Sequence, residues 1–256
     1  MLSKNIAKYI QSLSHKKLRD EEGAFIAEGP KIVAELLASK NFICKIICGE
    51  KEWLLVNKNL FNIPVADIYE VDEDSLKKIS LLKTPNKVIA VFRKKELKSQ
   101  PQLTNKISLV LDDISDPGNM GTIIRIADWF AIENIICSEN CVDVYNPKVV
   151  QSTMGSLARV NILYAVLTDF FEVHKNITIY AATLSGKNVS EFHNLDEGFL
   201  LIGNESKGIS TELLALSKNQ ITIARYGAAE SLNAAVATGI ILSHIIHSPL
   251  SQDRGT

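Results

Sequence analysis

The segment ISLVLDDISDPGNMGTIIR, residues 107–125, predicts the fold, because an apolar run leads through a short turn into a helix. Residues 107–111 are almost entirely apolar, which is typical of a strand covered on both faces. Asp116, Pro117 and Gly118 form the turn, and residues 120–130 have the pattern of a helix. A strand joined to a helix in this way is the repeating unit of a parallel α/β sheet.

The same alternation continues toward the C-terminus and differs from what precedes it. Further strands are predicted at residues 134–137, 160–165, 177–182, 199–203 and 221–224, with helices between them. We therefore expect an α/β fold with a mainly parallel sheet over residues 107–256. Residues 1–94 predict a small α/β domain, in which Pro30 begins one helix and Asp74 caps another. The polar, aperiodic residues 95–106 predict a linker.

Polar residues cluster directly after three of the predicted strands. The clusters are residues 119–125, 203–208 and 231–233. Ligands of parallel sheets bind outside the carboxyl ends of the strands, so the clusters are candidates for one shared site. Each cluster also has a purely structural explanation, namely an ion pair of Arg125 with Asp128, a tight glycine turn, and a helix cap by Ser231.

Two nucleotide-binding motifs are incomplete in this sequence. The second cluster approaches a P-loop, but Ile209 follows Gly208 where that motif requires lysine. No GxGxxG segment opens the second domain either. These departures disfavour a nucleotide-hydrolysing or dinucleotide-dependent enzyme.

The four cysteines form two pairs with the same spacing, Cys44 with Cys48 and Cys137 with Cys141. Such pairs could bind zinc or act in redox chemistry. They could equally be small buried side chains of two strand regions, and the spacing and the lack of nearby histidines favour this second interpretation. We expect no bound metal.

The charge is distributed unevenly along the chain. Residues 1–98 carry 18 Lys and Arg against 13 Asp and Glu, a net charge of +5 within a chain of net charge −1. This excess either contacts a polyanion or forms a solvated surface. Residues 1–5 lack the apolar core typical of a signal peptide, and no apolar run approaches the roughly 20 residues that span a bilayer. A cytoplasmic protein without a membrane partner is expected.

The order and spacing of the three clusters together resemble the SpoU/TrmH family of RNA ribose 2′-O-methyltransferases. Asn119 to Arg125 resembles the first family motif, Gly203-Asn204-Glu205 with Gly208 the second, and Ser231-Leu232-Asn233 the third. The sequence departs from the family pattern at Ala224, where proline is usual, and at Ala131, where glycine is usual. Residues 16–37 resemble the substrate-binding domain of rRNA-modifying members, and residues 145–150 and 154–156 resemble a further stretch of those members.

This resemblance implies a trefoil-knotted C-terminal fold, S-adenosylmethionine as the cofactor, and a homodimer formed through the knotted domain. The N-terminal domain would resemble a ribosomal-protein-like RNA binder. The implied reaction is methylation of a ribose 2′-hydroxyl, with 23S rRNA as the expected substrate. A tRNA methyltransferase and an inactive RNA-binding assembly factor are the alternatives.

The resemblance also implies roles for individual residues. Backbone contacts to the cofactor are expected near Thr183, Leu184, Gly203, Ile223 and Leu232. The expected catalytic residues are Arg125, Asn119, Glu205, Ser231 and Asn233. Arg125 is the residue of this family that has been regarded as the base, but arginine stays protonated in proteins, so we expect it to orient the substrate and stabilise charge. RNA contacts are expected from Lys16, Lys17 and Arg19.

Overall fold

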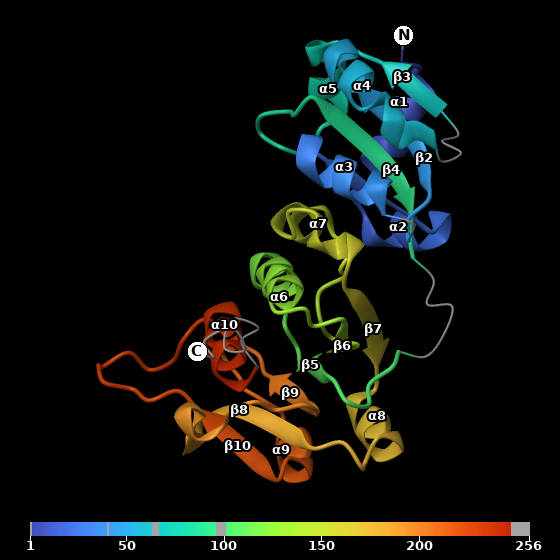
Figure 1. Cartoon of the computed structure of the whole chain (residues 1–256). Helices are drawn as coiled ribbons and strands as arrows, with labels where there is room; N and C mark the ends of the chain where they lie inside the picture. The colour runs from blue at the N-terminus through green and yellow to red at the C-terminus, as the bar shows by residue number, and fades with distance from the viewer. Residues whose placement is uncertain (1, 40, 63–66, 96–100, 247–256) are drawn as a thin grey trace, which may run out of the picture. The chain divides into compact units, whose positions relative to one another are not determined.

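The computed structural model describes residues 2–39, 41–62, 67–95 and 101–246, which divide into two compact units (Figure 1). The N-terminal unit comprises Met1–Lys98 and Asp143–Arg159, and the C-terminal unit comprises Ser99–Val142 and Val160–Thr256. Residues 143–159 thus cluster with the N-terminal unit, although they follow the first strands of the C-terminal sheet. Of the predicted linker, residues 96–100 lie outside the described residues.

The N-terminal unit is built on a four-stranded sheet with the strand order β1-β4-β2-β3. β4 pairs antiparallel with β1 and β2, whereas β2 and β3 are parallel. The strands are β1 (Ala24–Glu28), β2 (Cys44–Gly49), β3 (Asp67–Glu70) and β4 (Val88–Arg93). Around them lie α1 (Lys4–Ser12), α2 (Lys16–Glu22), α3 (Pro30–Ala38), α4 (Lys51–Val56), η1 (Lys58–Asn62) and α5 (Glu73–Ile79).

Both faces of this sheet are covered, because its strands carry apolar side chains on each side. Ile26 of β1 and Ile89 of β4 join the core formed with α1 and α5. Phe25 contacts Phe92 and Tyr145, with the Phe25 and Tyr145 ring centroids 4.6 Å apart. Tyr145 precedes α7 (Pro147–Ser152), which packs against β1 together with α3. Residues 143–159 therefore belong to the aromatic core of this unit.

The C-terminal unit contains a six-stranded sheet with the order β10-β8-β9-β5-β6-β7. Every pairing in it is parallel, which confirms the predicted fold class. Its strands are β5 (Ile107–Leu111), β6 (Asn134–Ser138), β7 (Asn161–Ala165), β8 (Ile179–Asn188), β9 (Gly198–Ile202) and β10 (Asn219–Thr222). Two further short 3₁₀ helices are η2 (Ser156–Ala158), which follows α7 in the N-terminal unit, and η3 (Val189–Glu191), which follows β8 in this one.

Helices cover the two faces of the parallel sheet (Figure 1). α6 (Pro117–Trp129) and α10 (Ala234–Ile245) pack together on one face. α8 (Leu167–Val173) and α9 (Thr211–Leu216) lie on the other, where Phe170 and Leu213 join Val110 and Phe199 in a buried core. Helices cover both faces of the central strands. The loops that follow the strands therefore meet at the carboxyl edge of the sheet.

One irregularity in the sheet shapes its ligand-binding edge. In the pairing of β8 with β10, Gln220 pairs with Ala181, but the next residue, Ile221, pairs with Lys187. The intervening residues of β8 therefore leave the ladder. Gly186 closes this excursion, and a Cβ there would lie 2.6 Å from the carbonyl oxygen of Gln220, so the two backbones approach closely.

All four cysteines are free and buried. Burial raises the pKa of the Cys44 and Cys48 thiols to about 12, so both stay protonated at neutral pH. No group of three or more His, Cys, Asp and Glu side chains suited to a metal ion occurs in the described part of the chain. Among the same residues, no helix has the length and apolarity to cross a membrane.

Candidate active site

The three polar clusters meet at the carboxyl edge of the parallel sheet. Asn119, in the first turn of α6, donates a hydrogen bond from Nδ2 to Oε1 of Glu205, which follows β9. Asn233, which caps α10, donates from Nδ2 to Oδ1 of Asn119 at 2.7 Å. A chain of hydrogen bonds thus links one residue of each cluster, although they are up to 114 positions apart.

Helix geometry fixes both asparagines. Asp116 caps α6 by accepting from the backbone N–H of Asn119, which places that residue at the exposed start of the helix. Asn233 caps α10 in the same way, accepting from the N–H groups of Ala235 and Val236 with Oδ1 and leaving Nδ2 for Asn119. The Asn233 oxygen is engaged within its own helix and the Asn119 oxygen by Asn233, so the amide orientations of both residues are restricted.

Two neighbouring aspartates anchor the loop after β9. Asp112 accepts from the backbone N–H of Ser210 at 2.8 Å, and Asp113 pairs with Nζ of Lys207 at 2.7 Å. The Asn204 side chain donates to the backbone oxygen of Asp113 at 2.8 Å. The two aspartates contact different groups, and neither forms a carboxylate pair with the other. Their role in this structure is to hold the second cluster against the first.

Close backbone contact explains the glycine at the end of β9. A Cβ at Gly203 would lie 2.4 Å from the backbone carbon of Gly208 and from the nitrogen of Ile209. Asn204 and Gly208 also form an antiparallel bridge, so the loop returns directly onto its own start. Any side chain at position 203 would force this turn apart.

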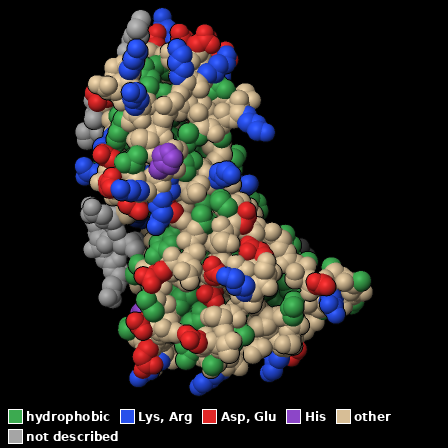
Figure 2. All heavy atoms as spheres, turned by 180° about the vertical axis from the view of Figure 1, so that it is seen from behind, with side chains coloured by type: hydrophobic (Ala, Val, Ile, Leu, Met, Phe, Trp, Pro, Cys, Tyr) green, Lys and Arg blue, Asp and Glu red, His purple; other side chains and the backbone are tan. Residues whose placement is uncertain are grey.

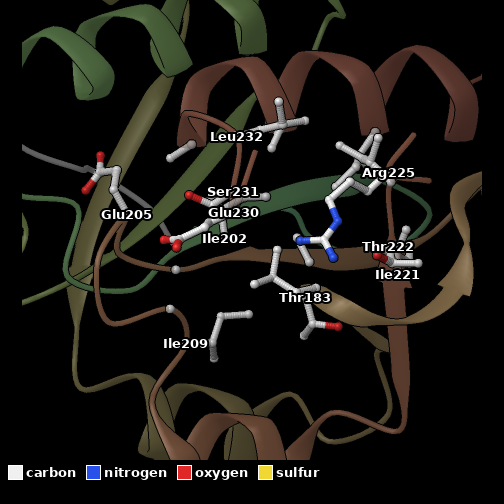
Figure 3. Close-up of a pocket in the computed structure, with 18 of the residues that line it drawn as sticks. Thr183, Ile202, Glu205, Ile209, Ile221, Thr222, Arg225, Glu230, Ser231 and Leu232 are labelled. Carbon is white, nitrogen blue, oxygen red and sulfur yellow. The ribbon is translucent and has the colours of Figure 1, made fainter. Parts of the chain in front are cut away.

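A cavity of about 610 Å³ lies beside the linked residues, between the ends of β8, β9 and β10. Its wall includes all five residues predicted to contact the cofactor, together with two of the predicted catalytic residues (Figure 3). These seven residues are Thr183, Leu184, Gly203, Ile223, Leu232, Glu205 and Ser231. Asn119, Arg125 and Asn233 are not part of its wall.

The character of the wall suits a nucleoside. Ile202 at the end of β9, Ile209 in the loop that follows it and Ile221 near the end of β10 provide apolar surface, and the strand ends supply backbone donors and acceptors. The volume lies within the range of about 300–1,000 Å³ that is usual for small-molecule sites. Gly203 lies in the same wall, where the lack of a side chain allows the loop to fold back against Gly208 and Ile209. These features fit an adenosine-containing cofactor.

Arg125 lies in the middle of α6 and is exposed. Its guanidinium makes no hydrogen bond or ion pair with any residue that the structure describes, so the alternative of a salt bridge to Asp128 is not observed. Arg125 follows Asn119 by six residues in the same helix. Because its guanidinium is exposed and has no described partner, it is available to bind an anion such as a phosphate.

The structure corrects the prediction for Arg19. Its side chain is only 1% exposed, and it donates to Asp143 Oδ2 at 2.7 Å and to the backbone oxygens of Leu13 and Ser14. A guanidinium that is buried and engaged in this way is structural and cannot contact RNA directly. The helical periodicity of residues 16–22 places it on the inner face of α2.

Lys16 and Lys17 remain candidates for RNA contact. Their side chains are 70% and 85% exposed, and the nearest carboxylates, of Asp20 and Glu21, lie 3.9 and 3.8 Å away. Exposed pairs of this length contribute little, so the ammonium groups are free to exchange partners. Lys and Arg side chains are spread over the upper, N-terminal part of the molecule in Figure 2, with acidic side chains between them.

The buried Arg19–Asp143 pair leads to the first prediction. Replacing Asp143 by Asn should lower the free energy of unfolding by about 2 kcal/mol, because the buried guanidinium loses its counter-charge but keeps an acceptor. Urea denaturation followed by circular dichroism measures this change. Asp20→Asn, which removes a carboxylate that is half exposed, is the matched control and should have a much smaller effect. Equal stabilities of D143N and wild type would contradict a structural role for the pair.

Comparison with known proteins assigns the fold and the site to a family. The sequence pattern of the SpoU rRNA Methylase family matches residues 106–243, more than half of the chain. This chain belongs to the SpoU rRNA methylase family. A second pattern, the MRM3-like substrate binding domain, matches residues 4–90. The family expected from the three clusters is thereby confirmed.

Individual relatives resemble the chain over nearly its full length. The 23S rRNA (guanosine(2553)-2′-O)-methyltransferase RlmP of Bacillus subtilis is 28% identical, with 92% of this chain and 93% of that protein covered. A solved structure of a protein assigned to the TrmH family, from Porphyromonas gingivalis, is 36% identical and superimposes with a TM-score of 0.84, covering 96% and 98% of the two chains. An AdoMet-bound rRNA methyltransferase from Sinorhizobium meliloti is 30% identical, with a TM-score of 0.81 and 94% coverage of both chains.

Proposed function

We propose that this protein transfers a methyl group from S-adenosylmethionine to the 2′-hydroxyl of a ribose in 23S rRNA. The observation that carries the proposal is the hydrogen-bonded chain Glu205–Asn119–Asn233 at the rim of the cavity that fits an adenosine. Family membership and the full-length relatives confirm the class of enzyme, a cofactor-dependent RNA ribose methyltransferase, and its cofactor. The choice of 23S rRNA follows the relative from Bacillus subtilis.

The cofactor supplies an electrophilic methyl group on a sulfonium. The residues of this chain hold the acceptor ribose in line with that group and exclude competing geometries. Asn119 cannot rotate freely, because its amide is held by Glu205 and Asn233 on either side. Ser231 presents its side chain at the cavity wall, beside Glu230. We assign orientation of the ribose to these four side chains.

Arg125 is assigned to the charge that develops on the ribose oxygen and to an adjacent phosphate. A guanidinium stays protonated at physiological pH, so it cannot accept the hydroxyl proton as a base. It can place two donors on neighbouring oxygens and stabilise negative charge there. The lack of any competing partner among the described residues leaves those donors available.

The same proposal covers the assembly and location of the enzyme. A trefoil-knotted arrangement of the C-terminal loops belongs to the proposal, and membership of the SpoU rRNA methylase family supports it. Lys16 and Lys17 are assigned to rRNA phosphates. A cytoplasmic location is part of the same proposal.

A homodimer formed through α6 and α10 is part of the proposal. The two helices pack together, and each carries an exposed apolar side chain, Trp129 at 85% and Val236 at 51%. Arg125 lies on the same helix as Trp129, so the partner would border the site. Light scattering should give twice the mass of the chain, and Trp129→Glu should shift it to the monomer. An active monomeric wild type would contradict this part of the proposal.

The activity is tested with purified protein, radiolabelled S-adenosylmethionine and protein-free 23S rRNA, with total tRNA as a second substrate. A 2′-O-methyl group protects the adjacent phosphodiester from alkali, so the label should be recovered in alkali-resistant dinucleotides from 23S rRNA. Label in tRNA alone would favour the alternative of a tRNA methyltransferase. Cofactor binding without transfer to either RNA would favour an inactive assembly factor.

A further inference from the structure

Some of the charged side chains that line the cavity hold neighbouring loops together, but others have no such structural role within the part of the chain that the structure describes. Four of them face it, namely Glu205, Lys207, Arg225 and Glu230. Glu205 accepts from Asn119, and Lys207 pairs with Asp113 at 2.7 Å. The other two, Arg225 and Glu230, are not used by the hydrogen-bonded chain or by the anchors of the second cluster.

Arg225 and Glu230 belong to one loop, which connects β10 to α10. The guanidinium of Arg225 points into the cavity, toward the space between Thr183 and Leu232 (Figure 3). Its one hydrogen bond among the described residues is a long one, 3.5 Å from Nη1 to the backbone oxygen of Ala229. Glu230 lies further along the same wall, beside Ser231, and makes no hydrogen bond or ion pair with a described residue. The loop therefore presents one free cation and one free anion to the cavity.

The rest of the wall is suited to different chemistry. Ile202, Ile209 and Ile221 form its apolar part, and Ile209 lies on the side of the cavity opposite Leu232. A ligand that fills this cavity should therefore have an uncharged aromatic end and a dipolar end. An α-amino acid is the simplest group with one carboxylate and one ammonium a single carbon apart.

We propose that Arg225 binds the α-carboxylate, and Glu230 the α-ammonium, of the methionyl part of S-adenosylmethionine. This inference rests on the proposed function and adds a charged clamp to a cofactor site that was expected from backbone contacts alone. The carboxylate is the only anion that the cofactor carries, so the guanidinium has a single partner on it. The two contacts would fix the amino-acid end and, through it, the direction of the methyl group.

Binding measurements with three ligands separate the two contacts. Decarboxylated S-adenosylmethionine lacks the carboxylate and keeps the ammonium, whereas 5′-methylthioadenosine lacks both. Titration calorimetry on the full chain, without RNA, measures each affinity. Arg225→Met should weaken S-adenosylmethionine about tenfold or more and leave the other two ligands unchanged within about threefold, because only the first ligand carries the anion.

Glu230→Gln should show a different pattern. It should weaken S-adenosylmethionine and the decarboxylated ligand together, and leave 5′-methylthioadenosine unchanged. S-adenosylhomocysteine, which has the amino-acid end but no sulfonium, should lose affinity equally, and this result excludes an interaction of Glu230 with the sulfonium. Lys218→Met, which removes an exposed cation of the same unit outside the cavity, is the matched control and should change none of the affinities.

Three results would overturn the inference, and they differ from a failure of the proposed function. If R225M lost affinity equally for all the ligands, the substitution would act by disturbing the loop and not by removing a contact to the carboxylate. Unchanged S-adenosylmethionine affinity with a raised KM for rRNA would assign Arg225 to the RNA backbone. If E230Q lost affinity only for ligands that carry a sulfonium, Glu230 would contact the sulfonium and not the ammonium. Absence of binding of every adenosine ligand to the wild-type protein would instead contradict the cofactor and the proposed function.

Discussion

Replacing Arg125 by Ala is expected to lower the rate of methyl transfer about a hundred- to a thousandfold, the effect of removing one preorganised donor from a developing oxyanion. The affinity for S-adenosylmethionine should not change, because Arg125 does not line the cavity. Single-turnover transfer to rRNA and calorimetry with the cofactor measure the two quantities separately. A loss that appears equally in cofactor affinity would place Arg125 at the cavity and contradict the assignment.

Arg125→Lys distinguishes a positioning guanidinium from a simple positive charge. Lysine keeps the charge but loses the fork of donors, so most of the activity should still be lost. The pH–rate profile of the remaining activity should keep the shape of the wild-type profile if Arg125 is not the base. Near wild-type rates in R125K would show that a guanidinium is not required, and a new ionisation in the profile would support a proton-transfer role at this position.

Replacing Gly203 by Ala is expected to reduce the affinity for S-adenosylmethionine by about a hundredfold or more. The added methyl would lie 2.4 Å from two backbone atoms, which cannot move without opening the turn from Asn204 to Gly208. That turn forms one wall of the cavity and carries Glu205. Calorimetry with the cofactor measures the loss, and circular dichroism shows whether the fold of the unit persists.

The matched control for this variant is Gly239→Ala in α10. A Cβ at position 239 would lie 3.6 Å from Cδ1 of Ile126, an ordinary contact, and alanine favours a helix interior. G239A should therefore bind the cofactor as the wild type does. If G203A also bound normally, the close approach of the two backbones would not be required for the site. If G239A also lost cofactor binding, added methyl groups would disturb this unit in general, and the loss in G203A would not be specific to the turn after β9.

The parts of the molecule that could be predicted from sequence are those whose structure is decided by the burial of apolar side chains. The strands of the parallel sheet are buried on both faces, so their apolar runs mark them, and all six predicted strands of the C-terminal unit are present within a few residues. The end of β9 was predictable for the same reason. β8 continues to Asn188, beyond the predicted end at residue 182. Its last residues are strand because they pair with β10, and that pairing cannot be read from the local sequence.

The start of a helix near several acidic residues was less predictable. Asp74 was expected to cap the helix that contains Leu76, but Asp72 is the cap and accepts from the N–H of Ser75. Both aspartates suit the first turn, so local preference does not distinguish them. Hydrogen bonding to Asp72 accordingly holds the pKa of that carboxyl below its usual range. The neighbouring prediction, that Pro30 begins a helix, is confirmed by α3.

Contacts between distant residues could not be predicted from one sequence. Arg19 had the features of an RNA contact in a basic stretch, but its partner Asp143 is 124 positions away. Arg225 and Glu230 stand between Ile223 and Leu232, which were predicted to contact the cofactor through their backbone, but the sequence does not show that these two side chains face the cavity. The positions of the three clusters after strands, and their order, predicted one shared site, but the hydrogen bonds that link Asn119 to Glu205 and Asn233 depend on the complete fold.

The central claim, that the three clusters form one site for methylating ribose, is tested most directly by mapping ribose methylation on rRNA from cells that lack this protein. The account predicts that one 2′-O-methylated nucleotide of 23S rRNA loses its modification, that the wild-type gene restores it, and that the R125A variant does not. An unchanged methylation map, or full restoration by R125A, would contradict it.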